Sequence, residues 1–276
     1  LKGALSDIVQ QGNLQPNLEY LEYSQKLQSI AAKNSRLKYA WLATCGTMAN
    51  ENALKICRQK KAGSRMIITF KNAFAGRSTL MTEITDNPAF KVNMPDYNEV
   101  LRLPFYDPKA PKDATLKVLK EHVAKHQGNI SCFAFEPMLG EGGYRAANNE
   151  FFVPLLDFCK AEGIPVWMDE IQTFTRTGNF FAFETLGLGQ YVDVCTIAKT
   201  AQNGCTFFTE EFKPDPGLLG GTFSGSTPAM SAGLEILRML DADGYLGASG
   251  KIAQIHKDFV GMLNELNEGS CKGLLR

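Results

Sequence analysis

A short apolar run that ends on two carboxylates constrains the fold of this chain more than any other stretch. Residues 166–168 form the run, an amphipathic segment at 151–161 precedes it, and Asp169 and Glu170 follow it. An apolar run of this length between a helix and a polar turn is typical of a buried strand in an α/β sheet. The chain should therefore emerge at the carboxyl edge of the sheet, where open α/β sheets bind their ligands.

A second apolar run, residues 192–198, ends on the cation Lys199. An acid at one strand end and a lysine at another suit a cofactor that carries both a basic ring nitrogen and an aldehyde. Pyridoxal phosphate has both groups, and its usual protein partners are an acid on the pyridinium and a lysine that forms a Schiff base. Asp169 and Lys199 are therefore candidate ligands of pyridoxal phosphate.

Strand-like and helix-like segments alternate along most of the chain. This order predicts an α/β fold with a mostly parallel sheet, and 276 residues suffice for one large domain or for one domain plus part of another. The expected strands are 39–44, 65–70, 130–136, 166–168 and 192–198, and the expected helices are 48–60, 114–127, 151–161, 229–240 and 252–266.

The charge balance argues against nucleic acid and membrane partners. Lys and Arg number 29, Asp and Glu number 29, and the formal net charge is zero. No apolar run approaches the roughly 20 residues that span a bilayer. Seven scattered cysteines form no C-x-x-C pair, which is typical of reduced, buried thiols, so we expect a cytoplasmic protein. The first residues lack Met and a signal-peptide core, so we expect that Leu1 is not the natural start.

The histidines predict no metal site. His122 and His126 are spaced like metal ligands on a helix, but no Glu or Cys partner accompanies them, and a solvated helix face is the better interpretation. The third histidine, His256, also lies on an expected helix away from every motif, which argues against triad chemistry.

Four other segments are candidate ligand contacts, each with a plainer alternative. Gly46 and Thr47 lie where a strand turns into a helix, which suits phosphate, although Thr47 could be an ordinary N-cap. Phe74 could stack on a planar ring or pack in the core. The glycine-rich loop 137–143 carries Glu141, and the loop 219–228 offers hydroxyl groups for phosphate or is a flexible turn.

The order of these motifs resembles the class III aminotransferases, also called ω-aminotransferases, over roughly residues 35–240. These enzymes share fold type I of the pyridoxal-phosphate enzymes. Within the family the chain looks closest to the enzymes that act on 4-aminobutyrate, on the side-chain amine of lysine, or on ornithine. The residues that carry the resemblance are 46–51, 74–77, 136–143, 169–172, 176–178, Lys199 and 222–223.

The resemblance implies the central roles of the site. Asp169 matches the acid that keeps the pyridine nitrogen protonated. Gln172 matches the residue that hydrogen-bonds the phenolic oxygen of the cofactor. Lys199 matches the Schiff-base lysine, which is released when substrate binds and then moves the proton.

The remaining contacts also follow from the resemblance. Gly46 and Thr47 match the phosphate cradle, and Phe74 matches the aromatic residue that stacks on the ring. Thr222 matches a hydroxyl donated to the phosphate across a subunit interface, so a homodimer with its active site at the interface is implied. Glu141 matches an acid near the substrate pocket. Glu136 and Arg77 are expected to be structural.

The chain departs from the family in some positions and in length. Ala75 and Phe174 replace a usual histidine and glycine, and Met138–Leu139 replace a usual Ile–Gln pair, which affects the expected substrate range more than the cofactor chemistry. Family chains are much longer. We therefore expect a three-layer large domain at 1–236, without its N-terminal segment, and the truncated beginning of a C-terminal small domain at 237–276.

The implied reaction is pyridoxal-phosphate-dependent transfer of an amino group to a 2-oxo acid such as 2-oxoglutarate, through a Schiff base on Lys199. The expected donor is a small ω-amino acid or diamino acid with a terminal amine. Another reaction on the same scaffold stays open, namely an aminomutase, racemase or decarboxylase. A non-catalytic cofactor-binding or oligomerisation module also stays open, because fold alone does not settle function.

Overall fold

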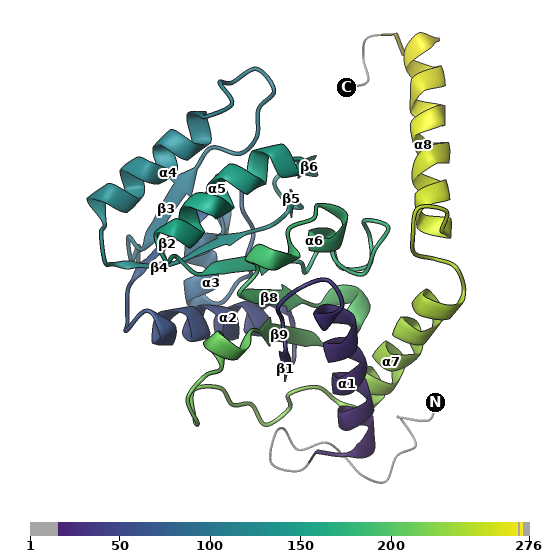
Figure 1. The fold of residues 1–276 in the computed structure, drawn as a ribbon, viewed down its shortest axis with the longest axis horizontal. Coiled ribbons are helices and arrows are strands. Elements are labelled where there is room, and N and C mark those ends of the chain that lie inside the picture. Colours follow the sequence, from purple (N-terminus) through teal and green to yellow (C-terminus); the bar gives the residue numbers. More distant parts are fainter. Residues whose placement is uncertain (1–15, 270, 273–276) are drawn as a thin grey trace.

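The computed structural model describes residues 16–269 and 271–272. A seven-stranded sheet forms the centre, in the order β1-β9-β8-β7-β4-β2-β3 (Figure 1). The pairs from β8 to β3 are parallel, whereas β9 runs antiparallel to both β1 and β8. The predicted mostly parallel sheet is confirmed. The strands are β1 (Tyr39–Ala43), β2 (Met66–Phe70), β3 (Val100–Leu103), β4 (Ile130–Phe135), β7 (Val166–Asp169), β8 (Val194–Ile197) and β9 (Gly204–Phe208), and a separate hairpin joins β5 (Met138–Leu139) to β6 (Arg145–Ala146).

Helices cover both faces of this sheet and give the predicted three layers (Figure 1). One face packs against α1 (Leu18–Ala32), α4 (Ala114–Lys125), α5 (Asn149–Ala161) and α7 (Thr227–Ala242). The other face packs against α2 (Gly46–Lys60) and α3 (Thr79–Ile84). The short α6 (Ala182–Thr185) and the long α8 (Lys251–Glu268) complete the α-helices of the described chain.

Strand β4 shows why the sheet needs both helix layers. All six of its residues are buried. Phe133 and Phe135 point to the α4–α5 side, whereas Cys132 and Ala134 point to the α2–α3 side. Because successive side chains of a strand face opposite sides, a strand that is apolar throughout must be covered twice.

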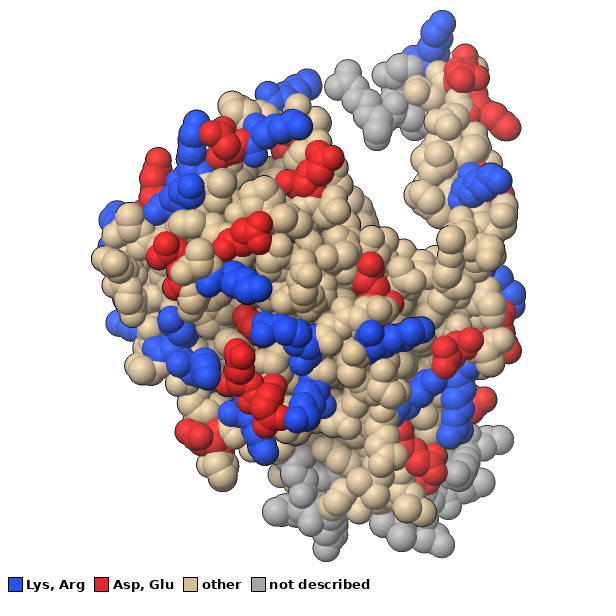
Figure 2. All heavy atoms as spheres, in the orientation of Figure 1, with Lys and Arg blue, Asp and Glu red and all other residues tan. Residues whose placement is uncertain are grey.

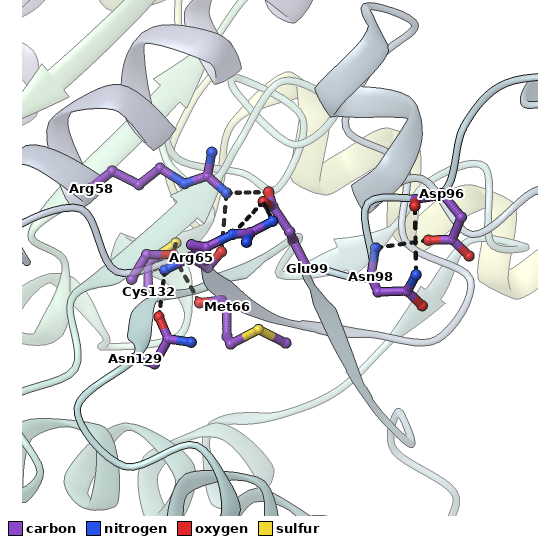
Figure 3. Close-up of polar contacts among 9 residues, drawn as sticks. Arg58, Arg65, Met66, Asp96, Asn98, Glu99, Asn129 and Cys132 are labelled. Carbon is purple, nitrogen blue, oxygen red and sulfur yellow. Dashed lines mark hydrogen bonds and ion pairs between the residues drawn. The ribbon is translucent and has the colours of Figure 1, made fainter.

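An ion cluster ties the amino ends of two strands to α2 (Figure 3). Glu99, just before β3, accepts a 2.6 Å bond from Arg58 Nη2 on α2 and a 2.9 Å bond from Arg65 Nε just before β2. Burial raises the pKa of Glu99, but the two guanidinium groups outweigh it and lower the pKa below its usual range. In the preceding turn Asn98 N donates to Asp96 Oδ1.

The C-terminal part of the chain leaves the body of the molecule. Helix α7 packs along α1, and α8 then projects away from the sheet (Figure 1). No described residue of α8 is buried. The side chains Ile255, Phe259, Met262 and Leu266 repeat every three or four residues and are 44–66% exposed. The expected domain boundary at residue 236 lies within the continuous helix α7 and stays a prediction.

Charged residues of both signs are interspersed over the face shown in Figure 2, as zero net charge suggests. Within residues 16–269, none of the helices combines the length and the apolarity that crossing a membrane requires.

Candidate functional site

A cavity of about 400 Å³ opens at the carboxyl edge of the sheet, around the ends of β7 and β8 and the start of α2. Its volume lies in the range of small-molecule sites. The structure brings seven of the eight predicted site residues to this cavity, from segments spread over more than half of the chain. They are Gly46, Thr47, Phe74, Glu141, Asp169, Gln172 and Lys199.

Asp169 is the last residue of β7 and is 7% exposed. Its Oδ2 accepts a 2.7 Å hydrogen bond from Asn50 Nδ2, and its Oδ1 accepts a 3.0 Å bond from Ile171 N. Burial raises the pKa of Asp169 to about 6, while these two bonds and the nearby Lys199 act in the opposite direction. At neutral pH the side chain is therefore mainly a carboxylate.

Asn50 is a site residue that the sequence reasoning did not single out. It lies one helical turn after Gly46, lines the cavity and is 1% exposed. Its Nδ2 also donates to Ala75 O at 2.8 Å, whereas its buried Oδ1 has no hydrogen-bond partner among the described residues. Its place inside the quoted segment 46–51 was the available clue. A buried acceptor without a donor is unusual in a native protein, and a water molecule or a polar ligand satisfies such a group.

Lys199 follows β8 and has a backbone φ of +53°. A residue other than glycine rarely adopts this left-handed conformation, and such strain is common at functional sites. No carboxylate of the described chain lies within ion-pair distance of Lys199 Nζ. The lysine is also the single basic side chain among the described residues that line the cavity.

The start of α2 is built to approach an anion. Its N-cap is Cys45, whose side chain makes no capping hydrogen bond, and Gly46 and Thr47 of its first turn line the cavity. The alternative that Thr47 is itself the N-cap is therefore wrong. Gly76, with φ of +133°, closes over Thr47, and a Cβ atom at that glycine would lie 2.5 Å from Thr47 Oγ1.

Glu136 joins two loops that line the cavity. Its Oε1 accepts a 2.9 Å bond from Phe74 N, and its Oε2 accepts a 3.1 Å bond from Gly140 N, next to Glu141. Burial and the charge of Asp169 raise the pKa of Glu136 to about 8. Glu136 thus holds two loops together, as expected of a structural residue, and it also lines the cavity.

Gln172 lines the cavity beside the glycine-rich loop. A Cβ atom at Gly140 would lie 3.0 Å from Gln172 Cγ, so the glycine allows close packing there. Arg176 Nη1 donates to Gln172 O at 2.9 Å.

Phe174, one of the departures from the family pattern, is fully buried and packs edge to face on Phe181 with 5.0 Å between ring centroids.

Asp169 and Glu170 are adjacent in the sequence but lie in different environments. Glu170 is fully buried and does not line the cavity. It accepts bonds from Thr173 Oγ1 at 2.6 Å and from the N–H groups of Ala182 and Phe183 at 2.8 Å, which fixes the start of α6. Burial raises the pKa of Glu170 to about 7. Glu170 is therefore structural.

Thr222 is the one predicted site residue that does not line the cavity. It is exposed on the loop before α7, and its expected role across a subunit interface stays a prediction. No group of three His, Cys, Asp or Glu residues within the described ranges is arranged to hold a metal ion.

Comparison with curated proteins gives the relatives of the chain. A probable 4-aminobutyrate aminotransferase of Bacillus subtilis is 30% identical, and the match covers 87% of this chain and 58% of the relative. An acetylornithine aminotransferase of Streptococcus mutans is 32% identical, with coverage of 84% and 59%. The chain therefore spans less than two thirds of the length of these relatives.

Solved structures share the fold. A lysine aminotransferase from M. tuberculosis superposes with a TM-score of 0.83 at 21% identity, covering 92% of this chain and 63% of the neighbour. An amine transaminase from an uncultivated Pseudomonas species, solved in its PLP-bound form, gives a TM-score of 0.83 at 20% identity, covering 93% and 64%. The predicted fold type I architecture is confirmed. The sequence profile of the family "Aminotransferase class-III" matches residues 5–272, and the chain belongs to the class III aminotransferases.

Proposed function

We propose that this chain forms the cofactor-binding part of a pyridoxal-phosphate-dependent aminotransferase. The observation that carries the proposal is the convergence of Asp169, Lys199 and the uncapped start of α2 in one cavity of about 400 Å³. An acid for the ring nitrogen, an amine for the aldehyde and a helix N-terminus for the phosphate are the three contacts that this cofactor requires.

The residues present fit the cofactor. The buried Asn50 Oδ1 lacks a donor, Lys199 lacks an ion-pair partner, and glycine alone fits over Thr47 at position 76. Gly46 and Thr47 would hold the phosphate. Phe74, Gln172, Asp169 and Lys199 would contact the ring face, the phenolic oxygen, the ring nitrogen and the aldehyde carbon, respectively.

The bound cofactor would supply an electron sink for the carbon that loses a proton. The chain supplies the charges and the proton carrier. The buried carboxylate of Asp169 would favour a proton on the ring nitrogen. Lys199 Nζ would accept the proton that leaves the substrate carbon.

We propose a terminal amine as the donated group and a 2-oxo acid such as 2-oxoglutarate as the acceptor. Relatives and structural neighbours named for 4-aminobutyrate, acetylornithine and lysine support this class, because each of these compounds carries an amine at the end of the chain remote from its carboxylate. Glu141, exposed at the mouth of the cavity, would contact the substrate.

We also propose the assembly and location that the resemblance implies. Two copies would form a dimer, and Thr222 of each copy would reach the phosphate of the other. Its exposed loop position supports this role. Residues 1–236 would belong to the large domain and 237–276 to the beginning of a small domain, in a cytoplasmic protein.

The test is an absorption spectrum of purified protein incubated with pyridoxal phosphate, before and after borohydride. We expect a visible band that borohydride removes while fixing the cofactor mass to the peptide containing Lys199. Lys199→Ala should abolish the band and the mass increase, whereas Lys125→Ala, on the exposed end of α4, should keep both. A parent protein without a visible band contradicts the enzyme proposal and favours a non-catalytic module.

A further inference from the structure

A second open cavity, which we call the β3 cavity, lies at the carboxyl edge of the sheet beside its last strand, β3. Its volume of about 370 Å³ is in the range of small-molecule sites. Its walls come from residues 71–72 after β2, residues 104–115 after β3 and residues 145–151 around the start of α5 (Figure 1). No described residue lines both this cavity and the one around Lys199. The chain therefore offers a second space of ligand size that the proposed cofactor contacts leave unused.

Hydrogen bonds connect the walls of the β3 cavity. Lys71 N donates to Leu103 O at 2.8 Å, which joins the first wall segment to the end of β3. Arg145 Nη2 donates to Tyr106 O at 2.8 Å, which joins the β5–β6 hairpin to the segment after β3. The fold itself therefore forms much of this space, and binding would have to order few residues.

Three aromatic side chains line the β3 cavity, and Phe151 contacts the other two. The ring centroid of Phe151 lies 5.6 Å from that of Tyr106 and 5.5 Å from that of Phe105. Phe105 is buried, whereas Tyr106 is 37% exposed. Aromatic surface in the wall of a cavity favours a planar apolar group, which can pack on it edge to face or in an offset stack. These residues therefore indicate a ligand that contains a ring.

Three basic side chains, one from each wall segment, also line the β3 cavity, namely Lys71, Lys112 and Arg145. None of them forms an ion pair with a carboxylate of the described chain. The guanidinium carbon of Arg145 lies 5.6 Å from the ring centroid of Phe105, and the bond to Tyr106 O engages one Nη atom. A guanidinium has five N–H donors, and those that remain suit a carboxylate, which it can bind through two parallel hydrogen bonds.

The charged side chains of the β3 cavity leave a positive excess. Two acids, Asp107 and Glu150, stand against the three basic residues, and neither acid forms an ion pair within the described ranges. Asp107 Oδ1 accepts from Lys109 N at 2.9 Å, and Glu150 lies in the first turn of α5, where the helix dipole favours a negative charge. The first turn of α4 lies in the wall as well, and its dipole adds positive potential. A ligand with a single negative charge balances this excess.

We propose that the β3 cavity binds a small aromatic carboxylate. The ring would pack on Tyr106 and Phe151. The carboxylate would accept hydrogen bonds from Arg145, with Lys71 and Lys112 adding positive charge. A carboxylate suits the site better than a phosphate dianion, because the two acids in the walls would repel a second negative charge. This site goes beyond the proposed function and does not require the cofactor, since the two cavities share no lining residue within the described chain.

The test measures binding of 2-naphthoate, a fluorescent aromatic carboxylate, to the purified protein without cofactor. We expect the fluorescence anisotropy to rise saturably with protein concentration, with a Kd below about 1 mM. Three competitors then separate the parts of the ligand, because benzoate has ring and charge, benzyl alcohol has only the ring, and acetate has only the charge. Benzyl alcohol and acetate should each compete at least about tenfold more weakly than benzoate. No saturable binding by the parent, or a neutral competitor as strong as benzoate, overturns the proposal.

Variants decide whether naphthoate binds in the β3 cavity. Arg145→Gln removes the hydrogen-bonding charge and should weaken binding at least about tenfold. Lys112→Gln keeps the test decisive if Arg145→Gln does not fold, because Lys112 is exposed, and it should weaken binding by about threefold. Lys109→Gln is the matched control, because Lys109 is exposed in the same segment but does not line the cavity. It should leave the Kd within about twofold of the parent.

The cavity around Lys199 is the alternative location for naphthoate, because it also combines a cation with an aromatic side chain, Phe74. Lys199→Ala should therefore leave the Kd of naphthoate within about twofold of the parent. Binding that Lys199→Ala abolishes, or that neither Arg145→Gln nor Lys112→Gln weakens, overturns the proposal. Failure of the proposed function has a separate sign, namely a parent protein that forms no visible band with pyridoxal phosphate.

Discussion

Asn50 Nδ2 donates a 2.7 Å hydrogen bond to Asp169 Oδ2 from a position 119 residues away in the sequence. The same nitrogen also donates to Ala75 O. One buried amide therefore fixes both the acid at the end of β7 and the loop that follows β2. Asn50 lines the same cavity as the acid it holds.

Replacing Asn50 by alanine should weaken the site without unfolding the chain. The variant removes a hydrogen bond to a charged group, worth about 2 kcal/mol, which corresponds to a loss of roughly 30-fold in affinity for pyridoxal phosphate. The pKa of Asp169 should rise, because one of its charge-stabilising donors is lost. Fluorescence titration with the cofactor measures the change. Asn52→Ala, a buried asparagine on the same helix that does not line the cavity, should leave the affinity within twofold.

Replacing Gly76 by alanine should displace Thr47 and weaken phosphate binding. The new Cβ atom would lie 2.5 Å from Thr47 Oγ1, and the φ of +133° is unfavourable for any side chain. We expect a destabilisation of at least about 2 kcal/mol and a lower affinity for the cofactor. Gly128→Ala separates strain from contact, because Gly128 has φ of +76° and nothing within 4 Å of the added atom. Equal cofactor affinities for the two variants would contradict the predicted contact.

The buried acids should make the fold less stable at alkaline pH. Burial raises the pKa of Glu170 from 4.5 to about 7 and, with Asp169, that of Glu136 to about 8. Between pH 4.5 and about 8 these two groups bind more protons in the native state than in the unfolded state, so their contribution to stability is fully present below pH 4.5 and is lost as the pH rises towards 8. Glu170 alone accounts for roughly 3 kcal/mol. Thermal unfolding between pH 5 and 9 measures this trend. In Glu170→Gln the unfolding temperature should depend less on pH below pH 7.

The cluster around Glu99 should give the opposite pH dependence. Arg58 and Arg65 lower the pKa of Glu99 against the effect of burial, so its contribution is present above the unfolded value and disappears as the pH falls through the folded value. Glu99→Gln should cost about 1–2 kcal/mol at pH 7, since both guanidinium groups are partly exposed. Denaturant unfolding of the parent and the variant at pH 7 and pH 3 measures this cost with Glu99 ionised and with Glu99 more protonated. A loss of the same size at both pH values would contradict the ionic origin.

The fold was largely predictable because strand ends and helix faces are local features. The buried runs at β4, β7 and β8 are apolar throughout, which identifies parallel strands covered on both sides. Strand β3 was missed within the proline-containing segment 83–113. It is four residues long and carries Arg102, whose guanidinium binds the carbonyl groups of Glu83 and Ile84 rather than solvent.

The site was predictable where chemistry follows a strand end and not where it depends on distant contacts. Asp169 and Lys199 end their apolar runs, so their positions follow from the sequence. The roles of Asn50 and Glu136 depend on hydrogen bonds across 119 and 62 residues, respectively, and no local pattern reports these. Glu170 shows the converse. Its neighbour Asp169 lines the cavity, whereas Glu170 itself accepts hydrogen bonds from the first N–H groups of α6.

The left-handed backbone conformation at Lys199 lowers the stability of the fold while it keeps an amine in the cavity. Glycine adopts a φ of +53° without steric cost, whereas lysine has to be held there by its surroundings at a cost of about 1 kcal/mol or more. Lys199→Gly should therefore unfold at a higher temperature than Lys199→Ala while lacking the amine in the same way. If so, the fold alone does not favour lysine at this position, and a search for more stable variants that ignored the chemistry would discard it.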